Sequence, residues 1–259
     1  MHGCGNDYVY INSFDLDVKS PKSLAISLSN RHTGIGSDGL VLILRSKVAN
    51  ARMRMFNTDG SEGDMCGNAI RCVAKYLYDN RMVQKLSMQI ETKSGIKKLY
   101  LSVKNGLVSS VKVDMGPACD IAATSVIIDG KKYEITCVSM GNPHAVTFGK
   151  KIDEIDLHKI GPLFEHNPVF PGGVNTEFIE VVRRNVLKMR VWERGSGETQ
   201  ACGTGACASA VASVLKGYCD KNKDIKVQLP GGTLTVKYTD EAVFMTGSCV
   251  KVFEGVVEL

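Results

Sequence analysis

Two similar stretches, 136 residues apart, decide how this chain is organised. Residues 66–77 read CGNAIRCVAKYL and residues 202–213 read CGTGACASAVAS. Each begins with Cys-Gly and continues with apolar residues at helical spacing, so each predicts a helix that starts directly after a cysteine. The second stretch is so rich in Ala and Ser that strands could pack around its helix on every side.

The same offset relates residues far outside the two helices. The aligned identities include Gly5-Asn6 with Gly141-Asn142, Met53-Arg54 with Met189-Arg190, Glu62 with Glu198, and Ala74 with Ala210. Downstream the match drifts by one residue, which brings Gly95 onto Gly232. One register held from residue 5 to residue 74 indicates two structural halves of similar design, with Met115-Gly116-Pro117 as the boundary between them.

Composition restricts the classes of protein to which the chain could belong. Its 259 residues fit one large domain or two ordinary ones, and 44% hydrophobic with 23% charged residues is a globular mixture. A net charge of +5 and only 7% aromatic residues argue against a nucleic-acid binder. No membrane-spanning stretch or signal segment is recognisable, so we expect a cytoplasmic protein without a membrane partner.

Nine cysteines cannot all pair within one chain, and no two are spaced as C-x2-C. In a reducing cytoplasm we therefore expect free thiols, most of them packed as small apolar side chains. Helical geometry places Cys72 on a different face from Cys66, and Cys207 on a different face from Cys202. Neither pair could therefore bind one metal ion together. We expect no metal site.

Local patterns predict a chain that is mostly strand with a few helices, that is, an α/β protein of the α+β type. Asn105-Gly106 and Asp129-Gly130 are typical of tight hairpin turns. Two further helices are expected at Pro21–Arg31 and Leu157–Phe164. The strand-like runs are Tyr8–Ile11, Leu40–Leu44, Met53–Phe56, Ser87–Thr92, Val108–Asp114, Ser125–Ile128, Tyr133–Val138, Ala145–Phe148, Thr176–Val182, Leu187–Trp192, Ile225–Leu229, Leu234–Tyr238 and Val250–Val257.

Each predicted Cys-Gly helix start places a thiol beside unpaired helix amides. The first amides of a helix carry positive potential, which lowers the pKa of a thiol and favours the thiolate. The amides of Gly67-Asn68 and Gly203-Thr204 could also hold a carboxylate. The run from Gly203 to Ala208 fits the G-x-G-x-x-A dinucleotide fingerprint, but no apolar strand precedes it, so we reject a nucleotide site.

Two thiols from similar halves indicate two reagents on opposite faces of one substrate. Stereoinversion at an acidic carbon needs this arrangement, because one thiolate removes a proton while the other thiol delivers one. Helix N-termini aimed at a carboxylate would stabilise the developing carbanion. This chemistry needs no cofactor, and we expect none.

The residues that carry these features resemble the diaminopimelate epimerase family. The resemblance runs in order along the chain. Its motifs are Met1–Asp7, Asn30–Gly36, Phe56–Glu62, Met65–Asn68 with Arg71-Cys72, Ser139–His144, Val174-Asn175 and Glu193–Gly205. It implies two pseudo-symmetric halves, each a curled, mainly antiparallel sheet or barrel around a central helix, with the site in the cleft between them. It also implies that the C-terminal strand rejoins the first half. The expected halves are thus residues 1–115 with 248–259, and residues 116–247.

The resemblance also implies the activity and the site residues. The activity is cofactor-independent epimerisation of L,L-diaminopimelate to meso-diaminopimelate, in lysine and peptidoglycan-precursor biosynthesis. Cys66 and Cys202 take the positions of the catalytic pair, and His144 and Glu193 those that influence thiol ionisation. The expected partners are this small-molecule substrate and, as an option left open, a second copy of the chain in a homodimer. The substrate-binding positions fall on Asn6, Asn57, Gly67, Asn68, Asn142, Asn175, Glu193, Arg194, Gly203 and Thr204.

Two residues depart from the family pattern. Gly39 stands where many members have a glutamine that touches substrate, and Cys4 replaces an aliphatic residue next to Asn6. Three other functions stay open at this point: a racemase of another amino acid, a redox protein with a Cys66–Cys202 disulfide, and a binding module that retains the fold.

Overall fold

The computed structural model describes residues 1–258 and divides them into two compact units. Unit 1 holds Met1–Val113 together with the described residues from Gly247 onward, and unit 2 holds Asp114–Thr246. The predicted division into domains, residues 1–115 with 248–259 and residues 116–247, stays a prediction, because compact packing alone does not show independent folding. Of these residues, Leu259 lies outside the described part.

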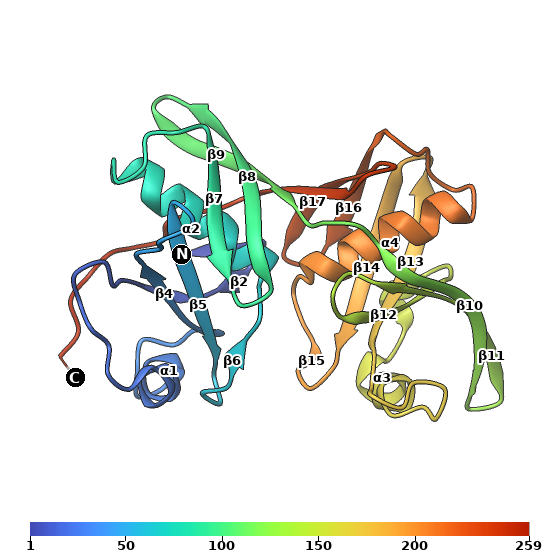
Figure 1. Ribbon diagram of the computed structural model, residues 1–259. Coiled ribbons are helices and arrows are strands. Elements are labelled where there is room, and N and C mark those ends of the chain that lie inside the picture. Colours follow the sequence, from blue (N-terminus) through green and yellow to red (C-terminus); the bar gives the residue numbers. More distant parts are fainter. Residues whose placement is uncertain (259) are drawn as a thin grey trace. The chain divides into compact units, whose positions relative to one another are not determined.

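Unit 1 is built on a mixed sheet (Figure 1). Parallel pairs join β3 to β4 and β5 to β7, and antiparallel pairs join β4 to β5, β7 to β8 and β8 to β9. Helix α2 packs against the sheet and the small β1–β2 ribbon. The bounds are β1 His2–Gly3, β2 Asn6–Asp7, β3 Val9–Asn12, α1 Pro21–Ser29, β4 Gly39–Leu44, β5 Ala51–Asn57, β6 Glu62–Gly63, α2 Gly67–Asp79, β7 Ser87–Thr92, β8 Gly95–Lys104 and β9 Leu107–Asp114.

Unit 2 repeats this plan with an added hairpin, β10–β11, at one edge of its sheet. Parallel pairs join β12 to β13 and β14 to β16. The bounds are β10 Cys119–Ile128, β11 Lys131–Ser139, β12 Pro143–Phe148, η1 Ile152–Glu154, α3 Leu157–Glu165, β13 Asn175–Arg183, β14 Val186–Glu193, β15 Gly197–Glu198, α4 Gly203–Leu215, β16 Asp224–Leu229, β17 Gly232–Tyr238 and β18 Val243–Ser248.

The internal repeat is confirmed at the level of elements. Helices α1 and α3, and helices α2 and α4, begin and end 136 residues apart. The strands β7 and β16 are offset by one residue more, as the drift in the sequence predicts. Arg54 pairs with Glu62 and Arg190 pairs with Glu198, so each unit carries the same ion pair next to its central strands.

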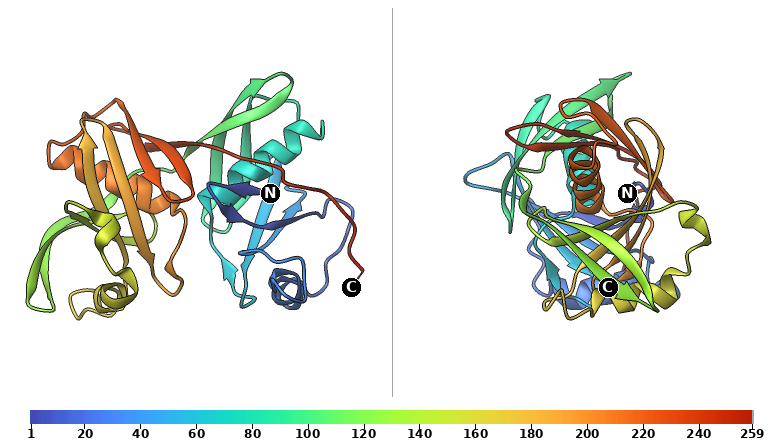
Figure 2. Two further views of the ribbon diagram at one scale, coloured as in Figure 1. Left: turned by 180° about the vertical axis from the view of Figure 1, so that it is seen from behind. Right: turned by 90° about the vertical axis from the view of Figure 1, so that its right-hand side faces the viewer.

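Helix α4 is the core of unit 2. Residues from Gly203 to Ser213 are buried except Thr204, and strands β11, β12, β13, β16 and β17 contact the helix. Figure 2 shows this helix end-on with strands around it. Ser209 and Ser213 donate to the carbonyl oxygens of Gly205 and Ser209, respectively, so their hydroxyls are satisfied within the helix. Small side chains let the surrounding strands approach closely, as the sequence predicted.

The predicted α/β fold class and both hairpin turns are confirmed. Asn105 and Gly106 have φ of 52° and 78°, which is the left-handed pair that a two-residue turn requires. The strand predicted at Val250–Val257 is wrong, because this segment is irregular and exposed apart from a bridge between His2 and Val250. The last strand is instead β18, which the sequence analysis missed together with β8. None of the helices among residues 1–258 is long and apolar enough to span a membrane.

Candidate active site

Cys66 caps the N-terminus of α2 and defines the Cys66 group. Its backbone is extended, with φ −128° and ψ 119°, and its sulfur accepts the amide of Ala69 at 3.5 Å. The thiol donates to Oδ1 of Asn6 at 3.4 Å, and Nδ2 of Asn68 donates to the same oxygen at 3.3 Å. Cys66, Asn6 and Asn68 therefore form one polar group at a helix N-terminus, where the potential is positive.

Charged and aromatic neighbours fix the Asn6 amide. Nδ2 of Asn6 donates to Asp38 at 2.8 Å, and Asp38 in turn pairs with Arg31 at 3.0 Å. Tyr8 is buried beside this group, and burial, followed by the nearby Cys66, raises the pKa of its phenol well above the usual value. Tyr8 therefore stays protonated at neutral pH.

Cys202 caps α4 in the same way and defines the Cys202 group. Its sulfur accepts the amide of Gly205 at 3.3 Å and lies 3.5 Å from Oγ1 of Thr204. Burial raises the pKa of the Cys202 thiol well above its ordinary value, and the charges of Glu193 and Glu177 raise it further. The contacts with Thr204 and Gly205 lower it, so helix start and burial oppose each other.

Polar side chains continue behind Cys202. Nδ2 of Asn142 donates to Oγ1 of Thr204 at 3.4 Å, and Oδ1 of Asn142 lies 3.1 Å from Nε2 of His144. Nδ1 of His144 is 2.7 Å from Oε1 of Glu177. The Cys202 group thus includes Thr204, Asn142 and His144, with Glu177 at its buried end.

Asn175, on the strand next to that of His144, contacts Arg194. Oδ1 of Asn175 accepts the amide of Arg194 at 3.0 Å, and its Nδ2 donates to the carbonyl of Pro143 at 2.8 Å. Nη1 of Arg194 donates to the carbonyl of Gly172 at 3.0 Å. The amide of Asn175, a predicted substrate-binding group, therefore connects the start of β12 to the segment after β14.

The remaining predicted residues have local partners. Asn57 donates to Oγ of Ser61 at 3.0 Å in the turn after β5, and Glu193 accepts the hydroxyl of Thr199. Gly67 and Gly203 are the first residues of α2 and α4. Within each unit the structure thus gathers the thiol, the helix start and predicted substrate-binding asparagines, Asn6 and Asn68 in unit 1 and Asn142 in unit 2. The assignment of catalytic and substrate-binding roles to all these residues stays a prediction.

The two departures from the family pattern have structural explanations. Gly39 has φ of +152°, and a Cβ there would lie 2.1 Å from the carbonyl oxygen of Phe56, so only glycine fits. Cys4 has φ of 54° and is buried, with its sulfur 3.7 Å from Nη2 of Arg71. Burial raises the pKa of the Cys4 thiol, which therefore does not add a thiolate to the Cys66 group.

Sequence reasoning missed Glu177 and Tyr8. Glu177 is a carboxylate in the otherwise apolar middle of β13, Thr-Glu-Phe-Ile, and such a residue is rarely buried without a partner. That signal could have directed attention to it. Its partner could not be identified in advance, because the contact between Glu177 and His144 depends on the parallel pairing of β12 with β13. In that pairing His144 lies opposite Asn175, and Glu177 follows two residues later on the same face of the strand.

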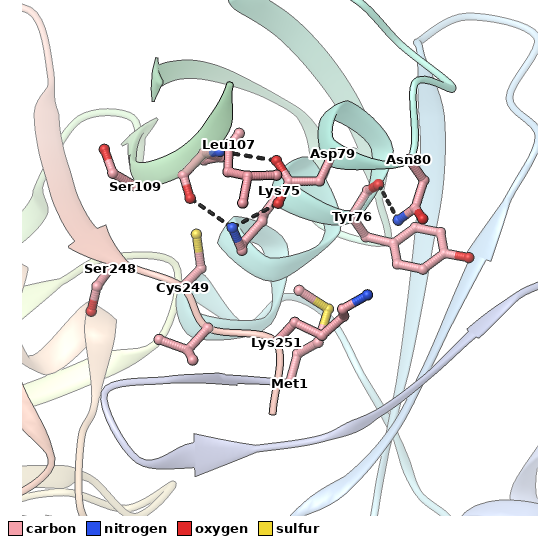
Figure 3. Close-up of a pocket in the computed structure, with 12 residues that line it drawn as sticks. Met1, Lys75, Tyr76, Asp79, Asn80, Leu107, Ser109, Ser248, Cys249 and Lys251 are labelled. Atoms are coloured by element: carbon pink, nitrogen blue, oxygen red, sulfur yellow. Dashed lines mark hydrogen bonds and ion pairs between the residues drawn. The ribbon is translucent and has the colours of Figure 1, made fainter. Parts of the chain in front are cut away.

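A pocket of about 510 Å³ lies in unit 1 near the C-terminal end of α2, away from its thiol cap (Figure 3). Lys75 points into its wall, but its ammonium group pairs with Asp79 at 2.7 Å and donates to the carbonyl of Val108 at 2.7 Å. With the charge of Lys75 neutralised in this way, we interpret the pocket as a packing feature.

The two similar halves, each with a cysteine that caps its central helix, define the structural class of this protein. The family model for diaminopimelate epimerase matches residues 1–120 and 136–252. The chain therefore belongs to the diaminopimelate epimerase family, which confirms the predictions of the family and of an isomerase.

Relatives match over the whole chain. The chain is 53% identical to a diaminopimelate epimerase of Acetivibrio thermocellus, covering 100% of this chain and 97% of that protein. It is 50% identical to one of Methanococcus maripaludis, covering 100% and 98%.

Solved structures show the same fold at low identity. A phenazine biosynthesis protein of the PhzF family from Bacillus anthracis has a TM-score of 0.74 and 19% identity, over 99% of this chain and 95% of that one. A probable proline racemase from Agrobacterium radiobacter has a TM-score of 0.68 and 15% identity, over 91% and 80%. At these identities the likeness shows the fold alone.

Proposed function

We propose that the chain interconverts L,L- and meso-diaminopimelate by a two-thiol acid–base mechanism that uses no cofactor. The step belongs to lysine and peptidoglycan-precursor biosynthesis. One observation supports this mechanism above the others. Cys66 and Cys202 occupy equivalent positions of the repeat, and each sulfur accepts the amide of the third residue after it at the start of a helix.

In this mechanism one thiolate takes the α-proton, so that a C–H bond breaks and an S–H bond forms. The other thiol gives its proton to the opposite face of the carbanion, and the products differ only in configuration. In the reverse reaction the two sulfurs exchange roles. The amides at the starts of α2 and α4 hold the α-carboxylate and stabilise the charge that develops on it.

The remaining polar residues would hold the two zwitterionic ends of the substrate. Asn6 and Asn68 lie beside Cys66, and Asn142 and Thr204 beside Cys202, where they suit the reacting end. Arg194 suits the distal carboxylate, because a guanidinium binds a carboxylate through two parallel hydrogen bonds. The further contributors to substrate binding would be Asn57, Gly67, Asn175, Glu193 and Gly203.

The function is tested by α-proton exchange in deuterium oxide. We expect L,L-diaminopimelate to gain deuterium at one α-carbon and to convert to the meso form, as followed by NMR and chiral chromatography. Other amino acids, for example histidine, proline and glutamate, are the controls, since they lack the second zwitterionic end. Exchange with one of them and not with diaminopimelate would show a racemase of another substrate.

We further propose that the enzyme is a homodimer that works in the cytoplasm, where both thiols stay reduced. The C-terminal tail presents four apolar side chains to solvent, and such a patch commonly marks a protein contact. Sedimentation equilibrium should give twice the 28.1 kDa of one chain. A mass of one chain at all concentrations would contradict the dimer. The tail residues are Val252, Phe253, Val256 and Val257.

A further inference from the structure

Unit 2 contains a buried pair of a histidine and a carboxylate that the equivalent positions of unit 1 lack. The side chains of His144 and Glu177 are both 0% exposed and lie 2.7 Å apart. Their counterparts at the 136-residue offset are Tyr8, whose phenol stays protonated, and the apolar Val41. The Cys66 group and the Cys202 group are therefore alike at the helix start, but the side chains behind the two thiols differ chemically.

The pair is connected to the thiol by a continuous series of contacts. Oε1 of Glu177 meets Nδ1 of His144 at 2.7 Å, and Nε2 of His144 meets Oδ1 of Asn142 at 3.1 Å. Nδ2 of Asn142 then meets Oγ1 of Thr204 at 3.4 Å, and that oxygen lies 3.5 Å from Sγ of Cys202. Four contacts thus join a buried carboxyl group to the sulfur.

The chemistry of the amide gives this series a direction. The nitrogen of the Asn142 amide donates to Thr204, so its oxygen faces His144 and must accept. Nε2 of His144 therefore carries a proton. Because Oγ1 of Thr204 accepts from Asn142, its own proton is available for the sulfur of Cys202. The three links from His144 to the sulfur then donate towards the thiol, which favours the thiolate.

The same assignment of donors and acceptors fixes the number of protons that His144 and Glu177 share. The 2.7 Å contact between Nδ1 and Oε1 needs a proton between them, in addition to the one on Nε2. With these two protons, imidazole and carboxyl together carry no net charge, whichever atom holds the shared one. Neutrality suits a pair without solvent exposure, because a net charge there would be costly. Oε2 of Glu177 is buried and accepts no hydrogen bond from the described residues.

Glu177 lies close enough to Cys202 for its charge to affect ionisation of the thiol. A Cβ added at Gly205 would lie 2.6 Å from Oε1 of Glu177 and 3.2 Å from Sγ of Cys202, so the glycine leaves room for both groups. A carboxylate with an uncompensated charge at this place would repel a thiolate. A proton shared with His144 compensates the charge of Glu177 and so weakens that repulsion.

We propose that Glu177 is a positioning residue for the epimerase reaction. By sharing a proton with His144 it keeps the buried pair neutral and fixes the imidazole tautomer that directs Asn142 and Thr204 towards Cys202. The inference rests on the proposed two-thiol function. It adds that different groups control the ionisation of Cys66 and of Cys202.

The first test needs no variant of Glu177 and no turnover. Nitrogen-15 NMR of the histidine-labelled whole protein resolves five imidazoles, and His144→Gln assigns one of them. We expect Nε2 of His144 to be protonated and Nδ1 to be in a strong hydrogen bond. A His144 with a bare Nε2 and a proton on Nδ1 would reverse the direction of the series and overturn the proposal.

The second test compares two substitutions of Glu177. Glutamine can donate an N–H to Nδ1 and preserve the tautomer, whereas leucine offers no partner. We expect the kcat of Glu177→Gln to exceed that of Glu177→Leu at least about tenfold, with similar KM values, because the residue acts through His144 on a proton transfer. Equal kcat values in two folded variants would overturn the proposal.

The matched control is Glu180→Leu, on the same strand. Glu180 accepts the amide of Ile152 and forms no hydrogen bond with the Cys202 group within the described part of the chain, so its replacement should leave kcat as in the wild type. Thermal unfolding of all three variants shows whether they fold. If the NMR result is as expected but diaminopimelate is not turned over, the proposed function fails and the proton arrangement stands.

Discussion

Replacing Cys66 or Cys202 with serine is expected to lower the rate of epimerisation by about three orders of magnitude or more. A hydroxyl ionises far less readily than a thiol, so serine can neither take the α-proton nor return it at a useful rate. The measurement is steady-state conversion of L,L- to meso-diaminopimelate by each purified variant. Because both sulfurs act in one turnover, the double variant should be little slower than either single variant.

The control for this prediction is Cys119→Ser. Cys119 is exposed, and its thiol donates to the carbonyl of Pro117 at 3.9 Å, away from both helix starts in sequence. We expect this variant to retain wild-type activity. Wild-type turnover by Cys66→Ser or Cys202→Ser would refute the two-thiol mechanism, and the redox hypothesis would then have to be tested by forming the disulfide.

Replacing Arg71 with leucine is expected to lower the free energy of unfolding by about 3–5 kcal/mol. Arg71 is 0% exposed, and it is the largest fully buried side chain among the described residues. It donates to the carbonyl of Gly67 at 2.9 Å, to Oδ1 of Asn68 at 3.0 Å and to the carbonyl of Ser248 at 3.3 Å. Leucine would remove these three hydrogen bonds from a position where the guanidinium is fully buried.

Urea denaturation followed by circular dichroism measures this loss. The control is Arg45→Leu, since Arg45 is exposed and pairs with Asp15 on the surface, where an ion pair contributes little. We expect that variant to lose no more than about 1 kcal/mol. Equal midpoints and slopes for the two variants would contradict a structural role for Arg71. Because Arg71 also orients Asn68, we expect Arg71→Leu to lose activity as well.

Much of the site could be predicted because it is built from short-range geometry. A helix start is decided by a residue and the three that follow it, and both Cys-Gly starts appear where the sequence placed them. The repeat could also be read directly, since an offset is a property of the sequence alone. Gly39 could not be interpreted in the same way, because its crowding comes from Phe56 on the neighbouring strand.

Strand prediction failed where the partner strand decides the outcome. The run Val250–Val257 has a strand-like composition, but the described tail residues form no ladder and expose their apolar side chains. β8 begins with Gly95-Ile96-Lys97-Lys98, which obscures its alternation, yet pairing with β7 and β9 holds it as a strand. Composition records the propensity of a segment but not the presence of a hydrogen-bonding neighbour.

The sequence by itself determined the family, the two similar halves and the two thiols at helix starts, because each depends on residue identity and local spacing. Tertiary structure alone decided what surrounds each thiol. The pairing of β12 with β13 places Glu177 behind His144, and the packing of β1–β2 on α2 buries Cys4 against Arg71. Burial and distant neighbours set the charge of a group, and neither can be read from its position in the chain.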